Sequence, residues 1–193
     1  MQRLADFIAG IDGVNRRRAW QRHIDALPDD AARAWDDLLG ELPIAAWSAL
    51  KESTLRQIDR HNPARGWHQA LDRFNEARAF LYLQALGYES VAFAPSSVEA
   101  AGPDLLARRG AMKIACEVKS IRLDAASAHL GRKLAPRLQD ASTQLAATGA
   151  DLSYIYLVVV GGDVAAVRAA LAATDLPACR VVVDCGGLVE TIS

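Results

Sequence analysis

Residues 102–120 read GPDLLARRGAMKIACEVKS, two runs of strand-forming residues separated by Arg109-Gly110. An Arg-Gly pair between two such runs predicts a turn, so we expect two neighbouring antiparallel strands. Side chains alternate between the two faces of a strand, and Glu117 and Lys119 therefore share one face of the second strand. A carboxylate and an ammonium at these positions are unusual, because a buried strand ordinarily carries apolar groups there.

A second acid stands at the start of the first of these strands. Antiparallel pairing is expected to bring Asp104 close to Glu117. Two neighbouring carboxylates repel each other unless a cation lies between them, and oxygen-only ligands are preferred by Mg²⁺ and Mn²⁺. We therefore predict a divalent metal site, with Lys119 placed to orient an attacking water or to stabilise developing charge. The alternatives are a turn residue at Asp104 and an ordinary solvated ion pair between Glu117 and Lys119.

Helical and strand patterns alternate around these two strands. The run SYIYLVVV (153–160) is apolar on both faces, as is typical of a central strand covered by helices. Pro136 is expected to kink or divide the helix around it, and Gly149 to end that helix. The predicted strands are 88–95, 104–109, 111–120, 153–160 and 179–185, and the predicted helices are 71–85, 130–145 and 164–173. This order predicts an α/β fold whose mixed central sheet is flanked by helices, with 111–120 and 153–160 at its centre.

The N-terminal part of the chain has a different pattern. Its sequence is helical up to about residue 61, with breaks at Asp12-Gly13, Pro28 and Pro43, so we expect three or four short helices. All four tryptophans lie in the first 70 residues. The residues after 61 contain Pro and Gly without apolar periodicity, which favours a domain boundary there.

Composition excludes several classes of protein. The three cysteines show no CxxC spacing and the four histidines are scattered, which argues against a disulfide framework and a zinc site. No apolar run approaches the length that spans a bilayer, and the N-terminus has no long apolar segment typical of a signal peptide. We therefore expect a cytoplasmic protein without a membrane segment. The net charge is −1, so a nucleic-acid surface would have to come from local clusters of Lys and Arg.

A family resemblance adds to this reading. Pro103-Asp104, twelve intervening residues and Glu117-Val118-Lys119 resemble the paired active-site strands of the PD-(D/E)XK nuclease superfamily. The resemblance implies a metal-dependent nuclease that hydrolyses phosphodiester bonds in DNA. We expect this nuclease to be an endonuclease. It implies Mg²⁺ or Mn²⁺ as cofactor, Asp104 and Glu117 as metal ligands, and Lys119 as a catalytic residue.

The resemblance covers roughly residues 69–160. It implies a restriction endonuclease-like core in residues 63–193, preceded by an N-terminal helical extension in residues 1–62. In that family a helix before the first strand often supplies another acid, and Glu76 stands in the matching place. The resemblance thus implies Glu76 as a further metal ligand and catalytic residue, the alternative being a helix-surface acid paired with Arg73.

Two basic segments are candidates for nucleic-acid contacts. The helix after the ExK strand presents Lys133 and Arg137 away from its leucine stripe, and the segment 15–23 mixes arginines with a tryptophan. For the first segment a solvated charged face is an equally good explanation, and for 15–23 a charged helix face with one core tryptophan is the commoner explanation. Some members of the family use a polar residue of this helix at the active site, and the sequence does not choose between Gln139 and Gln144. The alternative to a nuclease is an inactive nuclease-fold module that binds nucleic acid or a protein partner, and a homodimer is also open.

Overall fold

The computed structural model describes residues 2–59, 62–95, 102–123, 130–161, 164–174 and 178–192. The chain forms two compact units, Met1–Leu81 and Tyr82–Ser193. The division falls within the long helix α5 (Pro63–Ala85), which begins directly after the predicted domain boundary. Within the described ranges, no helix is both long enough and apolar enough to cross a membrane.

Four helices precede α5, in agreement with the sequence-based prediction. Gly13, Pro28 and Pro43 are the N-cap residues of the second, third and fourth helix, so the predicted breaks coincide with helix starts. Pro28 and Pro43 have ψ values of 140° and 147°, and Gly13 has a φ of 85°, so each of these residues lies outside the helical conformation. The four helices are α1 (Arg3–Ala9), α2 (Val14–Asp25), α3 (Asp29–Gly40) and α4 (Ile44–Gln57).

Aromatic side chains form the core of the N-terminal unit. The ring of Phe7 lies edge-on to Trp20 at a centroid distance of 5.5 Å and edge-on to Phe74 at 5.1 Å. Trp47 and Trp67 are also buried, so three of the four tryptophans belong to the core. Edge-to-face aromatic contacts add to the stabilisation that burial of these large rings already provides.

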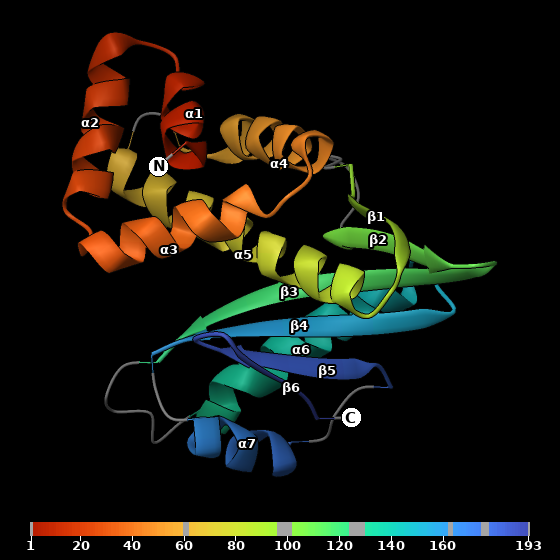
Figure 1. Ribbon diagram of the computed structural model, residues 1–193. Helices are drawn as coiled ribbons and strands as arrows, with labels where there is room; N and C mark the ends of the chain where they lie inside the picture. Colours follow the sequence, from red (N-terminus) through yellow and green to blue (C-terminus); the bar gives the residue numbers. More distant parts are fainter. Residues whose placement is uncertain are drawn as a thin grey trace. The chain divides into compact units, whose positions relative to one another are not determined.

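The C-terminal unit contains a six-stranded mixed sheet in the order β1-β2-β3-β4-β5-β6 (Figure 1). The β3–β4 and β4–β5 pairs are parallel and the other three pairs are antiparallel. The predicted central strands are therefore confirmed as the centre of the sheet. The strands are β1 (Glu89–Phe93), β2 (Leu105–Arg109), β3 (Met112–Arg122), β4 (Leu152–Val160), β5 (Arg180–Cys185) and β6 (Leu188–Thr191).

Two helices cover one face of this sheet. Leucines at positions 130, 134, 138 and 145 of α6 (Leu130–Ala146) pack with α7 (Val164–Ala172) against Ala115, Ile155 and Leu157. Figure 1 shows α6 and α7 on the same side of the strands. The strand residues buried on this face are odd-numbered, from Ala115 on β3 to Val159 on β4. Because side chains alternate along a strand, Glu117 and Lys119 lie on this same helix-covered face.

Pro136 was expected to kink or divide its helix, and the division is wrong. Residues 179–185 were expected to form the last strand, which is also wrong. Helix α6 continues through Pro136 without being divided. Pro136 is exposed, so water can hydrogen-bond to the backbone carbonyl that loses its partner there. The strand at 180–185 is followed by β6, which pairs with it as a hairpin across Gly186-Gly187.

Candidate functional site

The pairing of β2 with β3 places the two predicted acids opposite each other. Leu105 pairs with Cys116, and the backbone N–H of Asp104 donates to the carbonyl of Cys116 at 3.0 Å. The antiparallel ladder therefore extends to Asp104, whose partner position is Glu117. A carboxylate oxygen of Asp104 accepts a hydrogen bond of 2.8 Å from the backbone N–H of Val118. This bond fixes the Asp104 side chain beside β3.

Glu117 is an acid in an apolar setting. It is 4% exposed, and its neighbours along β3, Ala115 and Cys116, are buried. Burial and the negative charge of Asp104 raise the pKa of Glu117 from its ordinary value of 4.5 to about 7, against the opposing effect of Lys119. A carboxylate held in this way binds a proton more readily than an exposed one.

Lys119 completes the polar cluster. Its ammonium donates a hydrogen bond of 2.6 Å to Oε1 of Glu117 and one of 3.3 Å to Oε1 of Gln144 on α6. The side chain of Lys119 is 21% exposed, so its ammonium is held between the sheet and the helix but remains accessible from solvent. The structure thus brings together Asp104, Glu117 and Lys119, as the sequence predicted, and adds Gln144.

The donor set fits a small divalent cation. Within the described ranges, Oε2 of Glu117 is buried and has no hydrogen-bond partner. An unsatisfied buried carboxylate oxygen is costly, and a cation shared with Asp104 would remove both this cost and the repulsion between the two acids. No group of three or more His, Cys, Asp and Glu side chains converges among the residues that the structure describes. Two carboxylates suit Mg²⁺, because this ion usually keeps several of its waters.

Glu76 lies on α5 in the N-terminal unit. Its carboxylate is buried, with the residue 4% exposed, and forms an ion pair of 2.5 Å with Arg73, one turn earlier on the helix. The pair with Arg73 matches the alternative that the sequence left open, but Glu76 is buried and does not lie on the helix surface as that alternative assumed. A role for Glu76 as a further metal ligand stays a prediction.

Arg137 and Gln144 lie two helical turns apart on one side of α6. The guanidinium of Arg137 donates to the carbonyl of Ser120 at 3.0 Å, next to Lys119 on β3. The side chain of Lys133, the other predicted nucleic-acid contact, lies outside the described residues. The two basic side chains remain predictions as nucleic-acid contacts.

Gln144 is the functional candidate that the sequence did not single out. Gln139 is exposed, whereas Gln144 is half-buried beside Leu145 of the buried leucine stripe. Helical geometry alone places position 144 next to that stripe and position 139 on the far side of the helix, so this signal was present in the sequence.

Comparison of the chain with protein-family models, curated proteins and solved structures finds no match in any of the three.

Proposed function

We propose that this protein is a metal-dependent nuclease of the PD-(D/E)XK type, with a restriction endonuclease-like core, that hydrolyses phosphodiester bonds in DNA. The observation that carries the proposal is the buried carboxylate of Glu117 beside Asp104, with the ammonium of Lys119 at 2.6 Å. An ordinary ion pair would not need a second acid at this point. Burial of Glu117 against an apolar strand, with Asp104 and Lys119 partly buried beside it, is costly and favours a chemical role over a structural one.

The two acids would hold the metal. Asp104 and Glu117 supply oxygen ligands from neighbouring strands, and the hydrogen bond from the Val118 N–H keeps Asp104 in place. A bound Mg²⁺ or Mn²⁺ would neutralise charge on the phosphate and lower the pKa of a water molecule. Glu76 is proposed as a further ligand on the strength of the family resemblance.

Lys119 would act on the reacting groups. In hydrolysis a water oxygen forms a bond to phosphorus while a phosphorus–oxygen ester bond breaks, and negative charge builds up on the phosphate oxygens. The ammonium of Lys119 can orient the water or stabilise this charge. The contacts with Glu117 and Gln144 hold the ammonium in one position, so that it does not have to be ordered during the reaction.

The proposal is tested by cleavage of supercoiled, linear and branched DNA in the presence of Mg²⁺ or Mn²⁺. We expect Glu117→Ala and Lys119→Ala to lower the cleavage rate at least ~100-fold, the loss typical when a charge-stabilising group is removed. Lys113→Ala is the matched control, because Lys113 is an exposed lysine on the same strand. Circular dichroism would show that each variant is folded.

Cleavage that requires the metal, persists in Lys113→Ala and is lost in both site variants would support the proposal. Cleavage at the wild-type rate in Glu117→Ala or Lys119→Ala would refute the site. If the wild-type chain binds DNA but cuts none of these substrates, the inactive binding module becomes the better account.

A further inference from the structure

Helix α2 carries four arginines and one aspartate among its twelve residues. The side chains of Arg16, Arg18 and Arg22 are exposed and have no ion-pair or hydrogen-bond partner among the residues that the structure describes. Arg17, by contrast, donates to the backbone carbonyl of Ile11 at 3.0 Å. Three of these four guanidinium groups are therefore available to a partner.

Four other basic side chains of the N-terminal unit are paired with nearby acids, whereas Arg33 is an isolated exposed arginine among the described residues. Lys51 lies 2.9 Å from a carboxylate oxygen of Asp6, and Arg56 lies 2.6 Å from Glu52. Arg65 lies 3.9 Å from Asp59 and Arg73 pairs with Glu76. The concentration of unpaired positive charge on α2 is thus a local feature of this helix and not the general state of the unit.

Two charge placements on α2 are unfavourable for the helix itself, although Arg22 in the last turn is favourable for the helix dipole. Arg16 and Arg17 lie near its N-terminus, and no acid lies in its first turn. Positive side chains at that end oppose the helix dipole. Arg18 and Arg22 lie four residues apart, where two like charges repel each other. A polyanion at this surface would relieve both effects.

The helix presents these arginines outward. Trp20 and Ile24 are the buried residues of α2. Arg18 and Arg22 each lie two residues from Trp20, which corresponds to about 200° around a helix. Their guanidinium groups therefore extend from the face opposite the aromatic core, one turn apart, and can contact successive phosphates.

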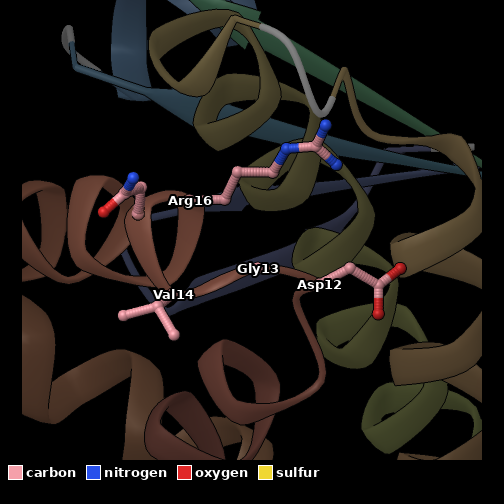
Figure 2. A pocket seen from close by; sticks show the side chains of 5 residues that line it. Asp12, Gly13, Val14 and Arg16 are labelled. Carbon is pink, nitrogen blue, oxygen red and sulfur yellow. The ribbon is translucent and has the colours of Figure 1, made fainter.

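An open hollow of about 450 Å³ lies at the start of α2. Figure 2 shows the side chains of Asp12 and Val14 extending to different sides of the backbone at Gly13, with Arg16 on the first turn of the helix. Because the acid Asp12 lines this hollow, we do not assign an anion site within it. The hollow leaves the Arg16 end of the helix open to solvent.

We propose that the outer face of α2, formed by Arg18 and Arg22, binds the phosphate backbone of DNA, with the exposed Arg16 at the start of the helix adding positive charge beside it. This surface deepens the proposed nuclease function by naming a DNA-binding surface of the N-terminal unit, and the choice of DNA as the polyanion rests on that function. Arginines that contact phosphates release bound counterions, so affinity through this surface falls as salt concentration rises. Such contacts position the nucleic acid without reading its sequence.

The test measures binding of the full chain to a fluorescent DNA duplex in EDTA, over a range of NaCl concentrations. EDTA prevents cleavage, so binding is measured separately from the proposed reaction. We expect Arg18→Gln/Arg22→Gln to weaken binding about 10-fold or more, and to reduce the slope of log affinity against log salt by about 2. Arg33→Gln/Arg56→Gln is the matched control, because both residues are exposed arginines of the same unit and Arg56 is paired with Glu52.

Weaker binding and a smaller salt slope in the α2 variant, with the control variant unchanged, support the inference whether or not the chain cleaves DNA. Equal affinity and equal slope in the α2 variant and the wild-type chain overturn it, even for a chain that cleaves DNA. Absence of salt-dependent DNA binding by the folded wild-type chain also overturns it and would direct attention to an acidic protein partner.

Discussion

Replacing Glu117 by Gln should stabilise the metal-free protein. The substitution keeps the shape of the side chain and removes its charge, which is buried at 4% exposure beside Asp104. Burial and the charge of Asp104 raise the pKa of Glu117 from 4.5 to about 7. Since each unit of pKa corresponds to about 1.4 kcal/mol, the ionised group destabilises the fold by about 3 kcal/mol.

The pH dependence of this effect has a definite sign. The folded protein binds the proton of Glu117 more tightly than the unfolded chain does. The destabilisation by ionised Glu117 is therefore absent well below pH 4.5, where this group is protonated in both states. It grows as the pH rises from 4.5 and is complete above about 7. The gain in stability of Glu117→Gln over the wild-type chain should therefore be near zero at pH 4 and reach about 3 kcal/mol at pH 8.

Urea unfolding in EDTA at pH 4 and pH 8 measures the free energy of unfolding of the wild-type chain and of Glu117→Gln, and the difference between them is this gain. Glu52→Gln is the control, because Glu52 is an exposed acid whose side chain is 72% accessible, and it should change the free energy of unfolding by less than ~0.5 kcal/mol. A Glu117→Gln protein that is no more stable than the wild-type chain at pH 8 would refute the argument that the buried, ionised carboxylate lowers the free energy of unfolding.

Two further predictions, one for each unit, each compare a test substitution with a control substitution. Gln144→Leu removes the helix-borne contact of 3.3 Å to Lys119 and should lower the DNA cleavage rate about 10-fold or more, whereas Gln139→Leu on the exposed side of α6 should leave the rate unchanged. In the N-terminal unit, a Cβ at Gly66 would lie 2.5 Å from the carbonyl oxygen of Asp59 and 2.7 Å from the Trp20 ring. Gly66→Ala should therefore lower the free energy of unfolding by about 1 to 3 kcal/mol. Gly40→Ala, where a Cβ meets nothing within 4 Å, should be neutral or slightly stabilising in the same denaturation experiment.

The central pair of strands and its acids could be predicted from the sequence alone. The alternation of side chains along residues 112–119 and the turn at Arg109-Gly110 were enough to place Asp104 opposite Glu117, and the Leu105–Cys116 register confirms it. Both signals are local, since they depend only on residues within the same hairpin.

The features that the sequence prediction missed depend on very short segments or on contacts between residues far apart in the sequence. Strand β6 has four residues, too few to show an alternating pattern, although Gly186-Gly187 with φ values of 62° and 93° is the kind of pair that joins a tight hairpin. Pro136 was expected to kink or divide α6, but the helix is not divided, and leucines on both sides of Pro136 pack into the same core. The contact between Gln144 and Lys119 joins residues 25 positions apart, which a pattern along one element does not reveal.

Metal binding tests the central claim most directly, because it does not depend on knowing the substrate. Titration of the full chain with Mn²⁺, followed by the electron paramagnetic resonance of the free ion, measures affinity in the wild-type protein, Asp104→Asn and Glu117→Gln. Glu89→Gln, an exposed acid on β1, is the control. We expect both site variants to bind Mn²⁺ at least ~10-fold more weakly than the wild-type and control proteins. Equal Mn²⁺ affinity in all four proteins would contradict a metal site at Asp104 and Glu117.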